Sequence, residues 1–163
     1  MSSKPKNNDD SATIENRKAR YEYEVSDTLE CGIVLFGSEV KSVRDGKVSL
    51  AEGYVRADPK TGELLLYSVN IGEYGPAGPA ELGRGHKPVR ARKLLAHKRE
   101  IAKLIKQTAI KGMTIVPLKM YFKEGWAKVL IGVAKGKSKY DKRQSIGKRE
   151  AQRDIARALS KRA

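Results

Sequence analysis

Residues 113–134 read MTIVPLKMYFKEGWAKVLIGVA, two apolar runs separated by the polar stretch Lys123-Glu124-Gly125. A glycine at such a point supplies the left-handed backbone conformation that a tight turn between two strands needs. The stretch therefore predicts a β-hairpin that turns at residues 123–125. We expect this hairpin to close the folded domain.

The segment at residues 20–36, RYEYEVSDTLECGIVLF, alternates apolar and polar side chains with a period of two. This alternation is typical of a half-buried strand, and it predicts either two strands or one long bent strand. Cys31 lies within it, and we interpret this cysteine as a small buried apolar residue. Residues 37–46, GSEVKSVRDG, lie between glycines and predict a helix of one or two turns.

A second hairpin is predicted at residues 53–71, GYVRADPKTGELLLYSVNI, where Asp58, Pro59 and Gly62 supply the turn. Residues 72–88, GEYGPAGPAELGRGHKP, contain five glycines and three prolines and predict an irregular loop.

One long helix is predicted at residues 90–112, RARKLLAHKREIAKLIKQTAIKG. Leucines and isoleucines recur at helical spacing, and Gly112 ends the pattern. Its apolar stripe consists of Leu94, Leu95, Ile101, Leu104, Ile105 and Ile110. Together these elements predict a mainly β domain, a small closed antiparallel OB-like barrel of about six strands with two or three flanking helices. The strand order does not follow from the pattern.

The last 29 residues, 135–163, read KGKSKYDKRQSIGKREAQRDIARALSKRA and carry a net charge of +8 out of +15 for the chain. Their apolar stripe, formed by Ala151, Ile155, Ala158 and Leu159, is too thin to order the segment by burial. We therefore expect a disordered basic tail that becomes helical on RNA. Residues 1–15 predict a disordered arm and residues 16–134 the folded domain.

The charge and composition exclude several classes of function. A pI near 9.9 with segregated Lys and Arg indicates a polyanionic partner, above all nucleic acid. The stretch GVAKGKS at residues 132–138 resembles a phosphate loop, but it has three residues between its glycines where the motif needs four. Acidic residues do not cluster as in a two-metal nuclease. We expect a binding protein without catalytic residues, cofactor or metal.

The cysteine count and the lack of long apolar segments indicate the cellular compartment. A single cysteine excludes a disulfide framework. The N-terminal residues lack the apolar core of a secretory signal, and the chain has no apolar run of ~20 residues. We therefore expect a protein of the reducing cytoplasm, with no membrane partner.

Basic and aromatic residues are adjacent at residues 16–23, NRKARYEY. Here Arg17 and Arg20 could hold phosphates while the ring of Tyr21 stacks on a base, although a core position for Tyr21 stays open. His97 lies at the edge of the predicted helix stripe, where a partly buried imidazole and an RNA contact are both possible. A structural ribosomal or rRNA-binding protein is the alternative to a specific RNA-binding factor.

Four blocks of the sequence resemble one known family. NRKARYEYEV, LECGIVLFGSEVKSVRDGKVSL, RARKLLAHKREI and KVLIGVAKGKSKYDKR are similar to the SsrA-binding (SmpB) family, the protein partners of tmRNA. This resemblance implies an OB-like barrel that binds the tRNA-like domain of tmRNA and delivers it to stalled ribosomes. It also implies a monomer when free, a tail that becomes helical in the empty mRNA channel near the decoding centre, and elongation factor Tu as a partner through aminoacyl-tmRNA.

The resemblance also implies which residues bind. On the tmRNA side it assigns Asn16, Arg17, Arg20, Tyr21, Glu30, Lys41, Leu95, His97 and Lys135. We add two basic residues, Arg92 and Lys137, to the predicted RNA-binding residues. In the tail, Asp141, Lys142 and Arg143 match the family motif, and Lys148, Arg149 and Arg153 supply further charge. Many members have His at the position of Tyr21 and some have Trp at Ala151. An ordinary surface role stays open for Glu30 and Lys41.

Overall fold

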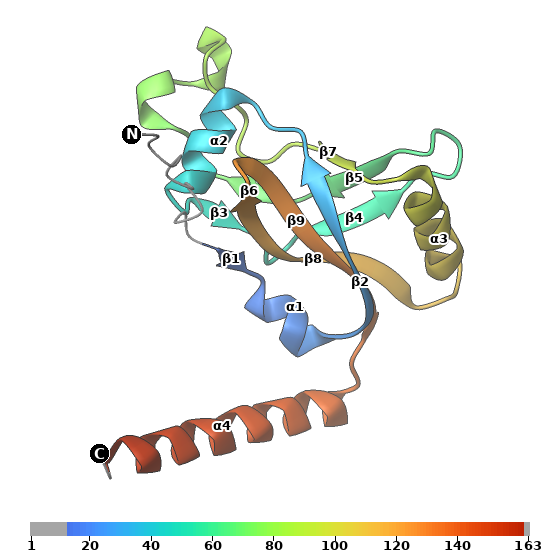
Figure 1. Ribbon diagram of the computed structural model, residues 1–163, viewed down its shortest axis with the longest axis vertical. Coiled ribbons are helices and arrows are strands. Elements are labelled where there is room, and N and C mark those ends of the chain that lie inside the picture. The colour runs from blue at the N-terminus through green and yellow to red at the C-terminus, as the bar shows by residue number, and fades with distance from the viewer. Residues whose placement is uncertain (1–12, 162–163) are drawn as a thin grey trace, which may run out of the picture.

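The computed structural model describes residues 13–161, and its centre is a ring of six antiparallel strands (Figure 1). The ring follows the order β8-β4-β5-β7-β2-β9 and is closed by the pairing of β9 with β8. Its strands are β2 (Tyr23–Ile33), β4 (Tyr54–Ala57), β5 (Leu64–Tyr67), β7 (Arg92–Leu95), β8 (Met113–Lys123) and β9 (Trp126–Gly136). The mainly β class and the predicted number of strands are confirmed.

The hairpin predicted from residues 113–134 is confirmed as β8 and β9. Glu124 and Gly125 form its two-residue turn, and both have positive φ, 54° and 82°. This pair of left-handed residues matches the twist of the two strands that it joins. Gly132 allows a close approach within the ring, because a Cβ there would lie 2.8 Å from Val25 Cγ1.

The N-terminal strand is one long bent strand rather than two. β2 pairs with β9 from Tyr23 to Gly32, with a bulge between Val25 and Asp27 that bends it. The sequence pattern missed the short helix α1 (Arg17–Glu22), which places Tyr21 on a helix instead of a strand. Asn16 starts this helix by accepting a hydrogen bond from Ala19 N–H at 3.0 Å.

The long helix predicted at residues 90–112 is wrong in its first part. Residues 92–95 form strand β7, in which Arg92 and Leu94 point inward and Lys93 and Leu95 outward. Helix α3 (Lys98–Thr108) begins only after His97, whose backbone N–H donates to the Glu100 carboxylate at 2.9 Å. Pairing with β5 and β2 overrides the local helical spacing, because both neighbouring strands have polar backbone groups that need partners.

The remaining elements surround the ring. Helix α2 (Gly37–Arg44) agrees with the predicted short helix, and the hairpin at β4 and β5 agrees with the predicted second hairpin. The Gly/Pro loop contains only two short turns of 3-10 helix, η1 (Gly75–Ala77) and η2 (Ala80–Leu82). Two small strands, β3 (Val48–Ser49) and β6 (Asn70–Ile71), pair with each other outside the ring.

Both ends of the ring domain extend past the predicted limits of 16 and 134. Ile14 and Glu15 form β1 on the edge of β8, so these two residues of the predicted arm are ordered, while residues 1–12 lie outside the described part of the chain. At the other end, β9 continues through Lys135 and Gly136.

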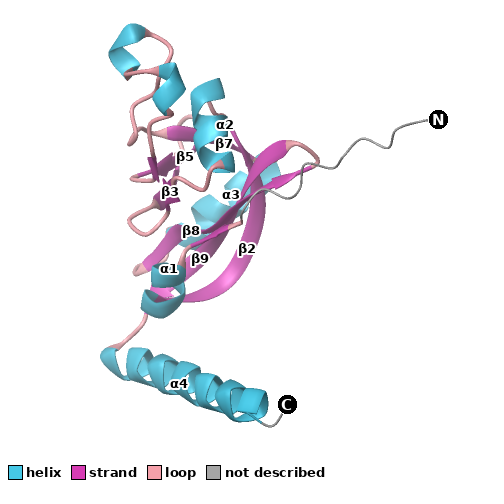
Figure 2. Ribbon diagram, turned by 90° about the vertical axis from the view of Figure 1, so that its left-hand side faces the viewer, coloured by secondary structure: helices cyan, strands magenta, loops and turns pink. Residues whose placement is uncertain are grey.

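The tail, predicted to be disordered when free, is helix α4 (Lys139–Lys161) in the structure, and it lies apart from the strands (Figures 1 and 2). From residue 146 on, the side chains of α4 are exposed. Alanine, arginine, lysine and glutamine, which have high helix propensity, are frequent in this segment and favour the helix. In the stretch from 13 to 161, no helix has the length and apolar character to span a membrane.

Candidate nucleic-acid interface

One outer surface of the ring is formed by four neighbouring strands and carries aromatic, apolar and basic side chains that the fold brings together. We call it the sheet face. It consists of Lys93 and Leu95 on β7, Glu30, Gly32 and Val34 on or just after β2, Trp126, Lys128 and Leu130 on β9, and Lys119, Tyr121 and Lys123 on β8. The register aligns these side chains in rows across the strands, because side chains alternate between the two sides of a sheet.

A hollow on this face brings three predicted residues together. Glu30, Leu95 and His97 line it from β2, β7 and the start of α3, with Gly32 and Lys128 between them. Gly32 leaves room for the Leu95 side chain, since a Cβ on Gly32 would lie 3.3 Å from Leu95 Cβ. Leu95 is 53% exposed, so an apolar surface lies beside a carboxylate and an amine.

Glu30 is held ionised by its neighbours. The Tyr121 hydroxyl donates to one carboxylate oxygen, and Lys123 Nζ lies 3.5 Å from the other. The hydrogen bond from Tyr121, followed by Lys123, lowers the pKa of Glu30 below its ordinary value. Burial, and then the bond to Glu30, raises the pKa of Tyr121 to about 12. Glu30 therefore presents an oriented negative acceptor, suited to the N–H groups of a base or a 2′-hydroxyl.

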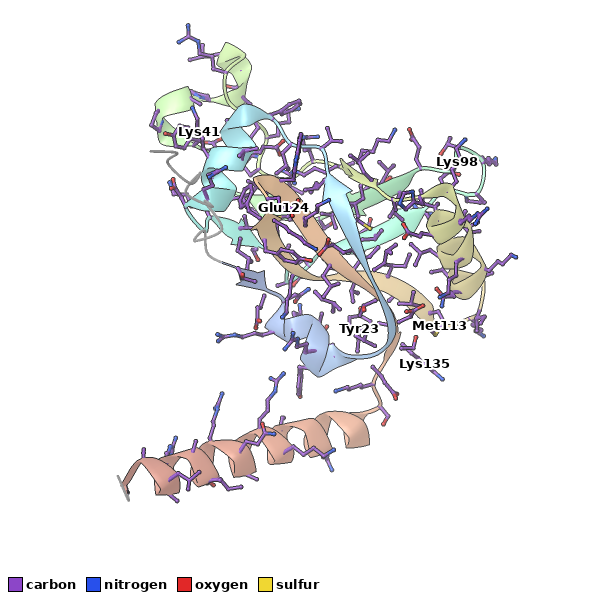
Figure 3. The ribbon with its side chains drawn as sticks, viewed as in Figure 1. Tyr23, Lys41, Lys98, Met113, Glu124 and Lys135 are labelled. Atoms are coloured by element: carbon purple, nitrogen blue, oxygen red, sulfur yellow. The ribbon has the colours of Figure 1, made fainter. Side chains whose placement is uncertain are left out.

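A second group of predicted residues lies on α1 and at the end of β9, which approach each other at Lys137, and we call it the α1 end. It consists of Arg17, Arg20, Tyr21, Lys135 and Lys137. The Lys137 backbone N–H donates to the Glu22 carbonyl at 2.8 Å, and its Nζ donates to the Arg20 carbonyl at 3.1 Å. These bonds attach the root of the tail to α1. Figure 3 shows Tyr23 and Lys135 next to each other at this end.

Two predicted RNA-binding residues are structural instead. Asn16 is buried, and its amide donates to the carbonyls of Leu50 at 3.0 Å and Pro117 at 2.8 Å. Arg92 is 0% exposed and forms an ion pair with Glu39 inside the domain. Neither side chain can reach RNA in this structure. Both predictions failed because a basic or amide residue in a polar stretch gives no sign of its burial.

Lys41 is on neither surface. It is exposed on α2, with its Nζ 5.2 Å from the centre of the Tyr74 ring. Figure 3 places it across the ring from Lys135.

The predicted tail residues lie on α4. Arg143, Lys148, Arg149 and Arg153 are exposed there, whereas the side chains of Asp141 and Lys142 lie outside the described part. The exposed cations occupy several sides of the helix, so α4 can meet phosphates from more than one direction.

Of the sheet face, only Glu30 and Leu95 were named from the sequence, and the residues that were missed include Tyr121, Lys123, Trp126 and Lys128. A signal was present, since residues 121–128 belong to the predicted hairpin and alternate outward. Only the register of β9 against β2, and of β8 against β9, shows that these four residues lie near Glu30 and Gly32.

A closed ring of antiparallel strands whose outer surface presents lysines and aromatic rings, followed in the chain by a basic helix, is the arrangement of a small RNA-binding protein. The particular family is equally clear. This chain belongs to the SmpB protein family, whose sequence model matches residues 13–161.

Individual relatives cover nearly the whole chain. The SsrA-binding protein of Listeria welshimeri is 49% identical over 156 residues, which is 94% of this chain and 96% of that protein. The SsrA-binding protein of Lactiplantibacillus plantarum is 51% identical over 150 residues, 92% of each chain. A chain in a solved structure described as "tmRNA-SmpB: a journey to the center of the bacterial ribosome" is 43% identical, with a TM-score of 0.64 over 82% of this chain and 94% of that chain.

Proposed function

We propose that this protein binds tmRNA and acts with it in trans-translation on the ribosome. The observation that carries the proposal is the match to the SmpB family over residues 13–161, with SsrA-binding relatives at 49% identity over 94% of the chain. The sheet face supports it chemically, because it offers an ionised acceptor at Glu30, an apolar surface at Leu95 and an amine at Lys128 within one hollow.

Two surfaces divide the work in this proposal. The sheet face and the α1 end bind the tRNA-like domain of tmRNA and deliver it to a stalled ribosome. Glu30, Leu95, His97, Arg17, Arg20, Tyr21, Lys135 and Lys137 make these contacts. The strand ring, which we predict to be OB-like, acts as the rigid support, since residues held in paired strands keep their spacing.

The tail enters the mRNA channel when that channel is empty. The tail has a net charge of +8 and competes with mRNA for the same narrow groove. It therefore fits only where mRNA is absent. Asp141, Lys142 and Arg143 lie nearest the decoding centre, and Lys148, Arg149 and Arg153 follow along α4. The attachment of Lys137 to α1 supports this arrangement, because it sets the point from which α4 leaves the domain.

The protein acts in the cytoplasm by binding rather than by catalysis, and it is a monomer when it is free of its partners. Elongation factor Tu joins the complex through the aminoacyl group of tmRNA.

The decisive experiment is to identify the RNA that copurifies with the protein after a high-salt wash. Non-specific phosphate contacts weaken steeply with salt, so a specific complex keeps one small stable RNA. Recovery of tmRNA in amounts well below those of ribosomes supports the proposal. Stoichiometric association with one ribosomal subunit, without tmRNA, would instead identify a structural ribosomal protein.

A further inference from the structure

We propose that Trp126 is a stacking platform for an unpaired base of the bound RNA, extending the RNA interface from the Glu30 hollow to the β8–β9 turn. The inference rests on the proposed function, because it takes RNA as the partner. It starts from the exposure of Trp126, which at 73% is high for the largest apolar side chain. A single exposed apolar residue means little, so its surroundings decide the matter.

Trp126 continues the apolar part of the sheet face. It lies two residues before Lys128 and four before Leu130, on the same side of β9, and Lys128 lies opposite Gly32. Val34, two residues beyond Gly32, points to the same side and is 46% exposed. Val34 N–H in turn bonds to the Lys93 carbonyl, next to Leu95. Trp126, Val34 and Leu95 therefore line one continuous surface that leads into the hollow.

The backbone position of Trp126 is fixed by strand pairing. It pairs with Lys123 as the first residue of β9, and the turn between them has only two residues, both with positive φ. Figure 3 marks Glu124 at this turn. This backbone keeps the exposed ring at a constant place on the sheet face, so a base can stack on it without any reordering of the strand.

The charges beside Trp126 suit a phosphate backbone. Lys123 and Lys93 are held in exposed ion pairs with Glu30 and Glu63, which are weak and can exchange partners. Lys128 has no ion pair among residues 13–161, and it lies two positions from Trp126. An aromatic platform with a nearby amine is the combination that binds one nucleotide through its base and its phosphate. A protein partner would gain less from the amines.

The chain contains one tryptophan, so its emission reports on Trp126 alone. The full-length protein is titrated with the isolated tRNA-like domain of tmRNA, and binding is followed independently by filter retention. The expected result is a saturable loss of tryptophan emission with the same midpoint as retention. Trp126→Ala should weaken binding about tenfold or more without changing the thermal midpoint.

Matched variants separate stacking from other roles. Trp126→Phe should retain most of the affinity, while Trp126→Leu should behave like Trp126→Ala, because leucine keeps an apolar surface without a ring. The slope of affinity against salt should stay unchanged in Trp126→Ala and fall by about one in Lys128→Ala. Ile110→Ala, at another exposed apolar residue outside the sheet face, should bind normally.

Three outcomes would overturn the inference. Retention of RNA with unchanged emission would place Trp126 away from the RNA while leaving the proposed function intact. Full RNA affinity of Trp126→Leu would show that an apolar side chain without a ring is enough, which contradicts stacking. Normal RNA binding by Trp126→Ala with reduced tagging on ribosomes would point to a ribosomal contact. If the unmodified protein retains no RNA in the filter assay, the proposed function itself fails.

Discussion

Glu39 and Arg92 form a fully enclosed ion pair, with Arg92 Nε 2.5 Å from the Glu39 carboxylate and both side chains 0% exposed. Arg90 donates to the same carboxylate and lies with its guanidinium 4.2 Å from the centre of the Phe36 ring. Arg92 also donates to the Val69 carbonyl at 2.8 Å. The pair therefore joins helix α2 to strand β7 and to the chain leading into β6.

Removing one member of this pair should destabilise the domain. Arg92→Met leaves the buried Glu39 carboxylate with only Arg90 and the Phe36 N–H as partners, which costs up to about 3–5 kcal/mol of unfolding free energy. The double variant Glu39→Met/Arg92→Met removes both charges and should recover much of that loss. Urea unfolding measures both effects. An Arg92→Met protein of normal stability with weakened RNA binding would restore Arg92 as an RNA contact.

The Glu39–Arg92 pair should make the free energy of unfolding depend on pH in the acidic range. Burial raises the pKa of Glu39, but hydrogen bonds from Arg90, Phe36 N–H and Arg92 outweigh it, so the folded-state pKa lies below the ordinary value. The stabilisation is complete above about pH 4.3, the unfolded-state pKa, and is lost as pH falls through the lowered folded-state pKa. Urea midpoints measured down to about pH 2 should show this loss.

Two variants isolate the contribution of Glu39 to the acid response. Glu39→Gln should be less stable at neutral pH and should lose less stability on acidification. Glu63→Gln, on the exposed end of a surface ion pair, should follow the unmodified protein. Identical acid curves for Glu39→Gln and the unmodified protein would show that other carboxylates cause the acid loss.

The single thiol should be unreactive in the native protein. Burial raises the pKa of Cys31 to about 12, so almost no thiolate exists near pH 8. A thiol-specific disulfide reagent should release no chromophore from the folded protein and one equivalent in strong urea. Rapid modification of the folded protein would mean that β2 opens locally, and a change in rate with added urea would measure that opening.

The bond between Tyr121 and Glu30 should matter for RNA rather than for folding. Glu30→Gln removes the charge and should weaken binding of the tRNA-like domain roughly tenfold, since hydrogen bonds to charged groups are worth about 1.5–3 kcal/mol. Tyr121→Phe leaves the charge of Glu30 but removes the hydrogen bond that orients its carboxylate, and it should weaken RNA binding less. Glu124→Gln, on the neighbouring turn, is the matched control. Equal affinities for Glu30→Gln and Glu124→Gln would remove Glu30 from the interface.

Cutting the chain after Ser138 should separate RNA binding from ribosome rescue. The cut preserves all of β9 and both hydrogen bonds of Lys137 to α1, so the tRNA-like domain should bind with nearly full affinity. Tagging of stalled nascent chains in a reconstituted translation reaction should disappear. A cut after Ala134 also removes Lys135 and Gly136 from the pairing with β2, and should reduce stability as well.

Point variants refine the test of the tail. Replacing Asp141, Lys142 and Arg143 together by alanine should abolish tagging, while the more distal set Lys148, Arg149 and Arg153 should cause a graded loss. Tagging that survives the cut after Ser138 would contradict the proposed role of the tail.

Features that depend on neighbouring residues in the chain were predictable. The turn at Glu124-Gly125 and the alternation around Cys31 are local, because a two-residue turn and a period of two leave direct marks in the sequence. The interpretation of Cys31 as a buried apolar residue is confirmed. Glu30, Leu95 and His97 were named from family motifs, and the structure brings them into one hollow.

Features that depend on distant pairing were not predictable. Leu94 and Leu95 have helical spacing to Ile101, and only hydrogen bonds to β5 and β2 make residues 92–95 a strand. Arg92 looks like one basic residue among many until Glu39, 53 positions earlier, encloses it. In the same way, the place of Trp126 beside the hollow follows from the register of β9 against β2.

Local sequence thus settled the two hairpins with their turns, the long strand around Cys31 and the charge of the tail, since each arises from interactions within a few residues. The tertiary structure alone decided which cations are buried, where β7 ends and α3 begins, and which side chains share the sheet face. The reason is physical: burial and register are set by contacts between segments far apart in the chain, and their free energies exceed the small local preferences that a single sequence reveals.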